Sequence, residues 1–182
     1  MRALLVRHAH RDAHNRLTEE GRETVSRVLM PLVQMIQFDC LASASASHCI
    51  ETAEVAAQWL RVVHTVPEFD KFVSFHDDLK ERARAAGRDH GELWFTETPQ
   101  DQALQMIRGP GRAYSTGLYS LRCAPAPRCA LVILRGTGLE GLACLLDPNY
   151  SPFNGGHFDR CEGFWVELVN GDLRLLSYVR RR

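Results

Sequence analysis

The chain changes from apolar to basic without a turn in residues 4–10, which read "LLVRHAH". The apolar run before Arg7 is typical of a buried strand, and we expect a strand over residues 3–7. Arg7 and His8 are costly to bury without partners. Ligands of parallel sheets bind beyond the carboxyl ends of the strands, so the sequence indicates a site where this strand ends.

A second strand ends in the same way. Residues 129–134, "CALVIL", are the clearest buried strand of the chain, and Arg135 follows directly. A helix is predicted over 139–146, opened by Gly136 and Gly138, and its N-terminal amides would suit an anion. Two separate strands therefore bring basic side chains to one edge of the predicted sheet.

Strands and helices alternate along the rest of the chain. We expect Thr18 to cap a helix that Pro31 kinks or ends, and Asn170-Gly171 to turn a hairpin. Ser47 is expected to cap a further helix. That helix covers 48–60, with Ile50, Ala53, Ala57 and Leu60 facing inward. Other strands are expected over 38–43 and 61–66. Other helices are expected near 77–86, 99–108 and 112–122.

This alternation predicts an α/β fold. We expect a three-layer α/β/α sandwich with a mostly parallel sheet and a C-terminal antiparallel hairpin. The 182 residues, 45% of them hydrophobic, suit one domain over 1–182.

Composition excludes several function classes. The formal net charge of +0 and the pI near 7.1 predict no nucleic-acid partner and no membrane surface. No apolar run approaches the roughly 18 residues of a membrane span, and no secretory signal is visible, so a cytoplasmic protein is expected. The basic run Arg180 to Arg182 is expected to be a solvated tail. The oligomeric state stays open.

Cysteines and histidines give no metal signal. The six cysteines form no CxxC pair and are expected to be reduced and structural, and the spacing of Cys123 and Cys129 does not support a metal or redox role. His8, His10 and His14 have no carboxylate at ligand spacing, so we expect no metal and no cofactor. His10 and His14 are expected to line the mouth of the site.

Four segments resemble, in order and spacing, the histidine phosphatase superfamily of phosphoglycerate mutase-like proteins. They read "LLVRHAH", "NRLTEEGRE", "ASASHCIETAEVAAQWL" and "LVILRGTGLEGLACLL". The resemblance covers residues 3 to about 147 and is weak over 68–125. The small branch that includes bacterial phosphohistidine phosphatases is the most similar, because of "RLTEEG" and the short chain.

The resemblance implies a catalytic pair, Arg7 and His8. His8 would take the phosphoryl group as a phosphohistidine before water removes it, and Arg7, His48 and Arg135 would bind the phosphate. Phosphoryl transfer depends on positioning and on positive charge around the phosphoryl oxygens. A guanidinium can grip two of those oxygens at once.

Two positions depart from the family pattern. His48, four residues before Thr52, stands where the family has arginine, and Arg135 stands where it has histidine. In one interpretation the pocket has lost two groups, and since one preorganised stabiliser is worth about 10²–10³ in rate, little activity would remain. In the other interpretation the two side chains have exchanged places and function survives in altered form.

The leaving-group acid and the function follow from the same resemblance. Many family members use a carboxylic acid in the middle region, where Asp77, Glu81 and Glu92 are candidates without a matching motif. We predict a protein that binds a phosphorylated small molecule or phosphoprotein, with hydrolysis of a phosphomonoester or phosphohistidine through phospho-His8. The alternative is an inactive pseudo-phosphatase that acts as a phosphate-dependent binding or regulatory module. A purely structural interaction protein is the third hypothesis.

Overall fold

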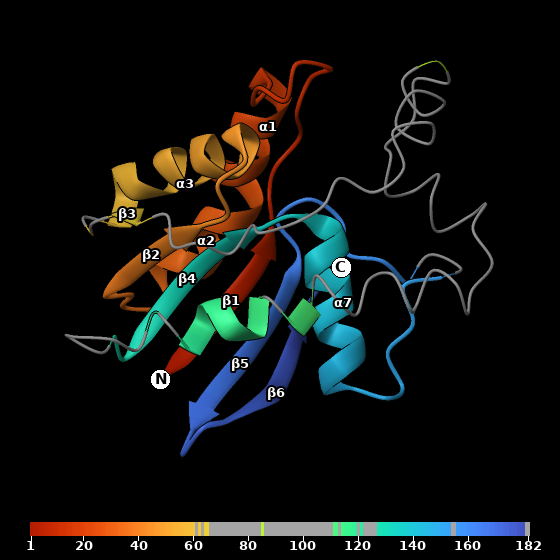
Figure 1. Cartoon of the computed structure of the whole chain (residues 1–182). Helices are drawn as coiled ribbons and strands as arrows, with labels where there is room; N and C mark the ends of the chain where they lie inside the picture. Colours follow the sequence, from red (N-terminus) through yellow and green to blue (C-terminus); the bar gives the residue numbers. More distant parts are fainter. Residues whose placement is uncertain are drawn as a thin grey trace.

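The apolar strands of the sequence assemble into one six-stranded sheet with β1 near its centre. The computed structural model describes residues 1–60, 62, 64–65, 85, 111–112, 114–119, 121, 127–153 and 156–180. The strand order is β3-β2-β4-β1-β5-β6 (Figure 1), parallel from β3 to β1 and antiparallel across β5 and β6. The strands are β1 Arg2–Arg7, β2 Cys40–Ser43, β3 His64–Thr65, β4 Cys129–Leu134, β5 Gly163–Val169 and β6 Asp172–Val179.

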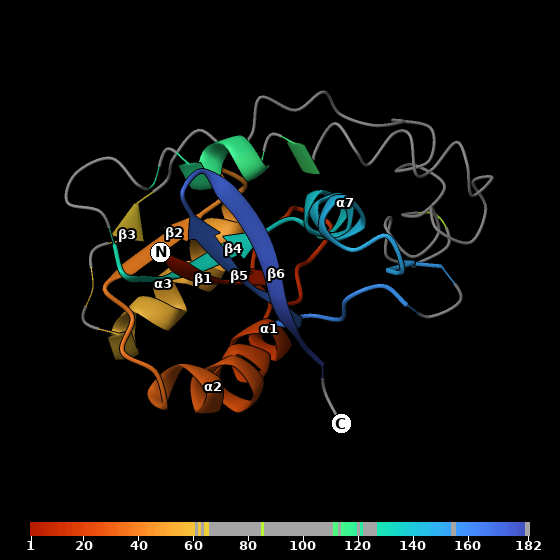
Figure 2. The ribbon, with the colours of Figure 1, turned by 90° about the horizontal axis from the view of Figure 1, so that it is seen from below.

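Helices cover both faces of this sheet. They are α1 Glu19–Thr24, the π-helical turn η1 Val25–Leu29, α2 Met30–Gln34, α3 Ser47–Leu60 and α7 Gly136–Leu146. Figure 2 shows α1 to α3 on one side of the sheet, and α7 with the helical residues 114–119 on the other. The predicted α/β fold with its mostly parallel sheet and antiparallel C-terminal pair is confirmed.

Thr18 caps α1 as predicted. Its Oγ1 accepts a hydrogen bond from the Gly21 backbone N–H at 3.0 Å, and Thr18 itself has extended backbone geometry. An N-cap oxygen satisfies a helix donor that would otherwise have no partner within the helix.

We expect Thr18→Ala to lower the free energy of unfolding by about 1 kcal/mol, the usual value of such a cap. Thr18→Ser keeps the oxygen and is expected to stay within about 0.5 kcal/mol of the wild type. Urea unfolding followed by circular dichroism measures both variants. Equal stability of the alanine and serine variants would contradict this role.

Pro31 changes the helix without ending it. Proline has no N–H and its ring disfavours a regular turn before it. In the structure the Met30 N–H donates to the Val25 carbonyl, five residues back, so the helix widens into the π turn just before Pro31 and then continues to Gln34. The helix therefore does not end at Pro31, and the irregularity that the proline was predicted to cause takes the form of a π turn.

The inward face of α3 differs from the predicted one. Ser47 is the first helical residue rather than the cap, and of the predicted inward residues only Ala53 is buried. The helix is turned so that Thr52 faces β1: its Oγ1 accepts the Ala9 N–H at 3.2 Å and donates to the His48 carbonyl at 2.6 Å. The buried set is His48, Cys49, Thr52, Ala53, Val55 and Ala56.

The C-terminal hairpin is confirmed. Asn170 and Gly171 both have positive φ, 51° and 91°, which suits the tight turn predicted from their sequence. The predicted helix over 99–108 lies outside the described residues, as does the one near 77–86 except for residue 85. Asp77, Glu81, Glu92 and Cys123 also lie outside them. In the described part of the chain, no helix has both the length and the apolar character needed to cross a membrane.

Candidate functional site

β1 ends at a site enclosed by its two neighbours. The side chains of Arg7 and His8 are almost fully buried, with 8% and 4% of their surface exposed. The His8 N–H donates to the Leu134 carbonyl of β4 at 2.9 Å, and the Arg7 N–H donates to the Glu162 carbonyl at 2.8 Å. The backbone at this end of β1 is therefore held from both sides.

The His8 imidazole has one nitrogen committed to the backbone. Its Nδ1 lies 2.7 Å from the Ala9 carbonyl oxygen, so Nδ1 carries the proton and donates, and the lone pair is on Nε2. Burial lowers the pKa of His8 well below 6.5, and the charges of His48, Arg160 and Arg7 lower it further, against a smaller opposing effect of the Ala9 hydrogen bond. His8 is consequently neutral near pH 7, the form that can act as a nucleophile.

His48 lies directly beside His8. The ring centroids are 4.1 Å apart and the rings are tilted by 55°, and His48 is 6% exposed. The position comes from the first turn of α3, which Thr52 ties to the end of β1. His8 and His48, which are 40 residues apart in the sequence, thus lie side by side in the interior of the protein.

Arg135 stands at the start of α7. It precedes α7 with extended backbone geometry, and its N–H donates to the Tyr114 hydroxyl at 3.2 Å. Its side chain is half-buried, and its guanidinium makes no hydrogen bond or ion pair with any other described residue. The structure therefore brings His48 to His8 and shows no polar contact between Arg135 and His8.

Arg160 is the site residue that the sequence did not reveal. Its Nη1 lies 3.1 Å from His8 Nε2 and 3.5 Å from Nδ1. Since Nδ1 donates to Ala9, the contact with Nε2 is the one in which the guanidinium donates to a lone pair. The strand pairing explains its position: β5 runs antiparallel to β1, so residues just before Gly163 lie at the carboxyl end of β1.

Arg160 belongs to the loop of residues 156–162, called the 156–162 loop below. Hydrogen bonds between backbone groups fix this loop to β1. The Cys161 N–H donates to the Arg7 carbonyl at 2.9 Å, and the Glu162 carbonyl accepts the Arg7 N–H. Cys161 has a φ of 62°, a left-handed conformation that costs a non-glycine residue energy and that is common near functional sites. The loop is therefore held in one defined conformation next to His8.

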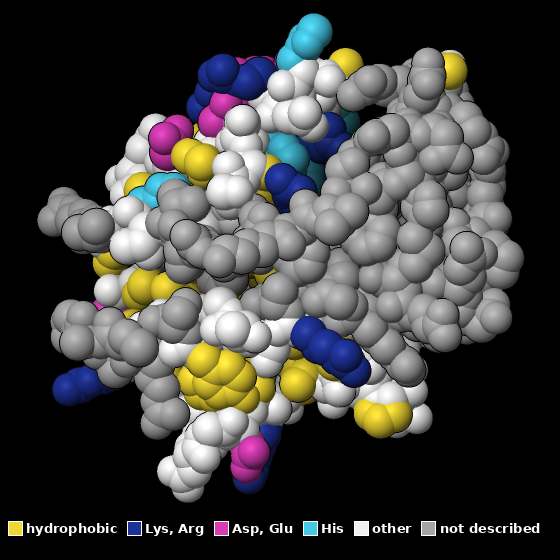
Figure 3. Space-filling model, in the orientation of Figure 1, with side chains coloured by type: hydrophobic (Ala, Val, Ile, Leu, Met, Phe, Trp, Pro, Cys, Tyr) yellow, Lys and Arg dark blue, Asp and Glu magenta, His cyan; other side chains and the backbone are white. Residues whose placement is uncertain are grey.

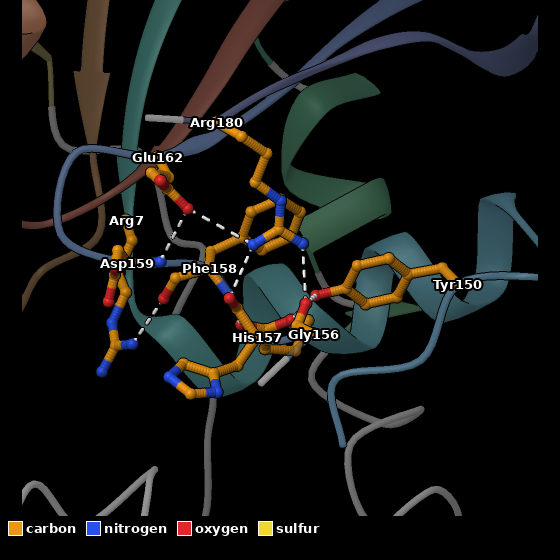
Figure 4. Close-up of polar contacts among 9 residues, drawn as sticks. Arg7, Tyr150, Gly156, His157, Phe158, Asp159, Glu162 and Arg180 are labelled. Carbon is orange, nitrogen blue, oxygen red and sulfur yellow. Dashed lines mark hydrogen bonds and ion pairs between the residues drawn. The ribbon is translucent and has the colours of Figure 1, made fainter. Parts of the chain in front are cut away.

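Two arginines from outside the loop also hold it, Arg7 at the end of β1 and Arg180 directly after β6 (Figure 4). Arg7 Nη1 donates to the Phe158 carbonyl at 2.6 Å. Arg180 donates to the His157 and Gly156 carbonyls, each at 2.6 Å, and its guanidinium lies 4.1 Å from the centre of the Phe158 ring. It also pairs with Glu162 at 3.3 Å.

The prediction of a solvated tail is therefore wrong for Arg180, because the loop's carbonyls and a buried carboxylate bind its guanidinium. Residues 181–182 lie outside the described residues.

Glu140 of α7 is a buried carboxylate beneath the loop. It is 1% exposed and accepts hydrogen bonds from the Phe158 N–H, at 2.6 Å, and from the Tyr150 hydroxyl. Burial raises the pKa of Glu140 from 4.5 to about 7, although these hydrogen bonds and the charges of Arg7 and Arg180 act in the opposite direction. Glu140 thus ties the position of Phe158 to a group that titrates near neutral pH.

The stability of the protein should depend on pH through Glu140. Because its pKa is higher in the folded state, its contribution is fully present below about pH 4.5 and is lost as the pH rises through about 7. A shift of this size corresponds to about 3 kcal/mol. We expect Glu140→Gln to remove that component, so that the stability difference between variant and wild type changes by about this amount in favour of the variant between pH 4 and pH 8.

Urea unfolding of both proteins across this pH range measures the effect, since the other titrating groups are common to the two. Glutamine can keep both contacts: its carbonyl accepts the Phe158 N–H, and its amide donates to Tyr150, whose hydroxyl then donates to the Gly156 carbonyl 3.1 Å away. Parallel pH profiles for the two proteins would contradict the prediction.

The other histidines of the first loop have separate surroundings. His10 Nδ1 lies 3.0 Å from Thr18 Oγ1, and His14 is exposed. Among the described residues, no three His, Cys, Asp or Glu side chains come together as a metal site would require. On the face shown in Figure 3, histidine and arginine or lysine side chains gather above the point where β1 ends. The site is thus rich in basic groups.

Comparison with known proteins identifies the fold. No protein-family model matches the sequence, and no curated protein matches it. Among solved structures, phosphoglycerate mutase from Bacillus anthracis str. Sterne is 17% identical with a TM-score of 0.63, over 97% of this chain and 92% of that chain. The alpha-ribazole phosphatase from Shigella flexneri is 16% identical with a TM-score of 0.58, over 98% and 96% of the two chains.

A third structure is that of phosphoserine phosphatase from Entamoeba histolytica in complex with 3-phosphoglyceric acid. It is 13% identical with a TM-score of 0.62, over 100% of this chain and 98% of that chain. The chain therefore has the fold of the histidine phosphatases and phosphoglycerate mutases, over nearly its whole length. The resemblance to the small phosphohistidine phosphatase branch stays a prediction.

Proposed function

We propose that this protein is a phosphatase that transfers a phosphoryl group to His8 Nε2 and then to water. The observation that carries the proposal is the state of His8: a neutral imidazole whose Nδ1 proton is bound to the Ala9 carbonyl and whose Nε2 lone pair faces basic groups. A nucleophile held in one tautomer, with positive charge around it, is what phosphoryl transfer requires.

The reaction would proceed in two balanced steps. Nε2 attacks phosphorus, the N–P bond forms, and the bond from phosphorus to the leaving group breaks with its electron pair on the leaving group, which takes a proton from solvent. Water then attacks phosphorus and the N–P bond breaks with its electron pair on Nε2, so that His8 is neutral again. Inorganic phosphate leaves with the two protons of that water and returns one of them to solvent. Arg7 would stabilise the phosphoryl oxygens, because it is permanently charged and acts electrostatically on the His8 ring.

His48 and Arg135 would complete the binding of the oxyanion. His48 lies against the His8 ring, and the Arg135 guanidinium, uncommitted among the described residues, extends from the start of α7. The proposed substrate is a phosphorylated small molecule or a phosphoprotein, including phosphohistidine, whose imidazole leaves more readily than an alkoxide. We also propose one cytoplasmic domain over 1–182.

One observation favours a second candidate function. Arg160 Nη1 lies within hydrogen-bond distance of Nε2, the atom that would have to be free to attack phosphorus. A guanidinium that stays there would leave a protein that binds phosphate groups without turnover, which is the phosphate-dependent binding module.

Two measurements separate these functions. The first is hydrolysis of p-nitrophenyl phosphate and of a phosphohistidine peptide, with the phosphoenzyme looked for after alkaline quench. The second is the melting temperature with orthovanadate or phosphate, because a ligand of the native state stabilises it by mass action. Turnover with a phosphoenzyme supports the phosphatase, a thermal shift without turnover supports the binding module, and neither effect contradicts both.

A further inference from the structure

We infer that Arg160 is a second phosphoryl-binding arginine of this site, filling the role that the family pattern gives to position 48. The inference rests on the proposed function, since it assigns a further residue to the same reaction. It starts from a direct contact between His8 and a cationic side chain, the 3.1 Å between Arg160 Nη1 and Nε2.

The position of the guanidinium fits this role. Nε2 is the atom that would carry phosphorus, and an N–H group that reaches Nε2 is within one side-chain movement of the oxygens on that phosphorus. When the phosphoryl group binds, the Arg160 side chain withdraws and its donors exchange the ring nitrogen for phosphoryl oxygens. Charge-assisted hydrogen bonds from a guanidinium to phosphate oxygens are stronger than a bond to a neutral imidazole, so the exchange is favourable.

The backbone around Arg160 keeps it in reach during that movement. The backbone groups of Cys161 and Glu162 are hydrogen-bonded to the backbone of Arg7. Cys161, the residue after Arg160, has a left-handed conformation. Glu162 Oε2 accepts the Asp159 N–H at 3.0 Å, which closes the turn from the other side. The Arg160 side chain is half-buried, and its movement would leave these backbone bonds in place.

Charge at His8 supports the same assignment. Arg7 and Arg160 both act electrostatically on the imidazole, together with His48. Two arginines and two histidines therefore meet at the nucleophile, although one arginine comes from the 156–162 loop and not from α3. The exchange of His48 and Arg135 is not needed to explain how this set is kept.

The test compares Arg160→Gln with the wild type and with Arg174→Gln. Arg174 lies on β6, 66% exposed, and pairs loosely with Asp172 at 3.9 Å, so its loss controls for the removal of one arginine. We expect Arg160→Gln to lower kcat/KM for p-nitrophenyl phosphate by about 10²–10³-fold, the usual effect of removing one preorganised stabiliser. It should also weaken orthovanadate binding by about tenfold or more, as expected for a lost charge-assisted contact. Arg174→Gln should match the wild type in both assays.

A further readout does not depend on turnover. Removing the Arg160 charge should raise the pKa of His8, which NMR titration of the His8 ring protons measures. Wild-type turnover and vanadate binding in Arg160→Gln, or faster turnover than the wild type, would overturn the inference and leave the proposed function intact. A wild-type protein that neither binds vanadate nor hydrolyses either substrate would instead overturn the proposed function, and the inference with it.

Discussion

His8→Ala is expected to abolish turnover, lowering kcat by about 10³-fold or more, because it removes the nitrogen that would carry the phosphoryl group. No phosphoenzyme should form. The fold should persist, since the backbone hydrogen bonds of residue 8 do not involve the imidazole. Hydrolysis of p-nitrophenyl phosphate and the alkaline-quench assay measure the effect, with circular dichroism as the check on folding.

His14→Ala is the matched control for this variant. His14 is an exposed histidine of the same loop, so its loss should leave turnover unchanged. A folded His8→Ala protein that keeps a tenth or more of the wild-type rate would contradict the role of His8 as nucleophile, whatever the state of the other basic residues.

Gly163→Ala is expected to destabilise the protein strongly, by about 4 kcal/mol or more, at the upper end of single substitutions. A Cβ at Gly163 would overlap the Leu5 carbonyl oxygen and approach the Val6 Cα to 2.9 Å, both on the backbone of β1. Gly163 is the register partner of Val6, so β5 would have to move away from β1. The same movement would shift the 156–162 loop, and activity should fall with stability.

Gly171→Ala separates this packing effect from the loss of a glycine as such. A Cβ at Gly171 meets nothing within 4 Å, and only its φ of 91° opposes the substitution. The expected cost is about 1–2 kcal/mol, that of a left-handed conformation. Urea unfolding measures both variants, and equal costs for the two would contradict the clash at Leu5.

Local patterns predicted much of the fold. The apolar runs of β1 and β4, the cap at Thr18 and the hairpin turn at Asn170-Gly171 each depend on neighbours within a few residues, and the structure confirms them. The inward face of α3 was predicted in part, because hydrophobicity alone set the expected stripe: Ala53 is buried, and Ala57 and Leu60 pack partly against the core. In the structure Thr52 faces inward for its hydrogen bonds, which rotates the helix relative to that stripe.

The site was predictable only where it follows strand ends. Arg7 and His8 end β1, and the family resemblance brought His48 to the same place, where the structure has it. Arg160 and Glu140 were missed because their proximity arises from the antiparallel pairing of β5 with β1 and from the packing of α7 beneath the loop. Neither relation leaves a periodic pattern in the sequence.

The attachment of the 156–162 loop has an evolutionary consequence. The loop joins β1 through main-chain groups of Arg7, Cys161 and Glu162, and such bonds form whichever side chain stands at position 160. The side chain at position 160 can therefore change during evolution without the loss of these bonds. Gly163 has no such freedom, because a Cβ there would overlap the backbone of β1.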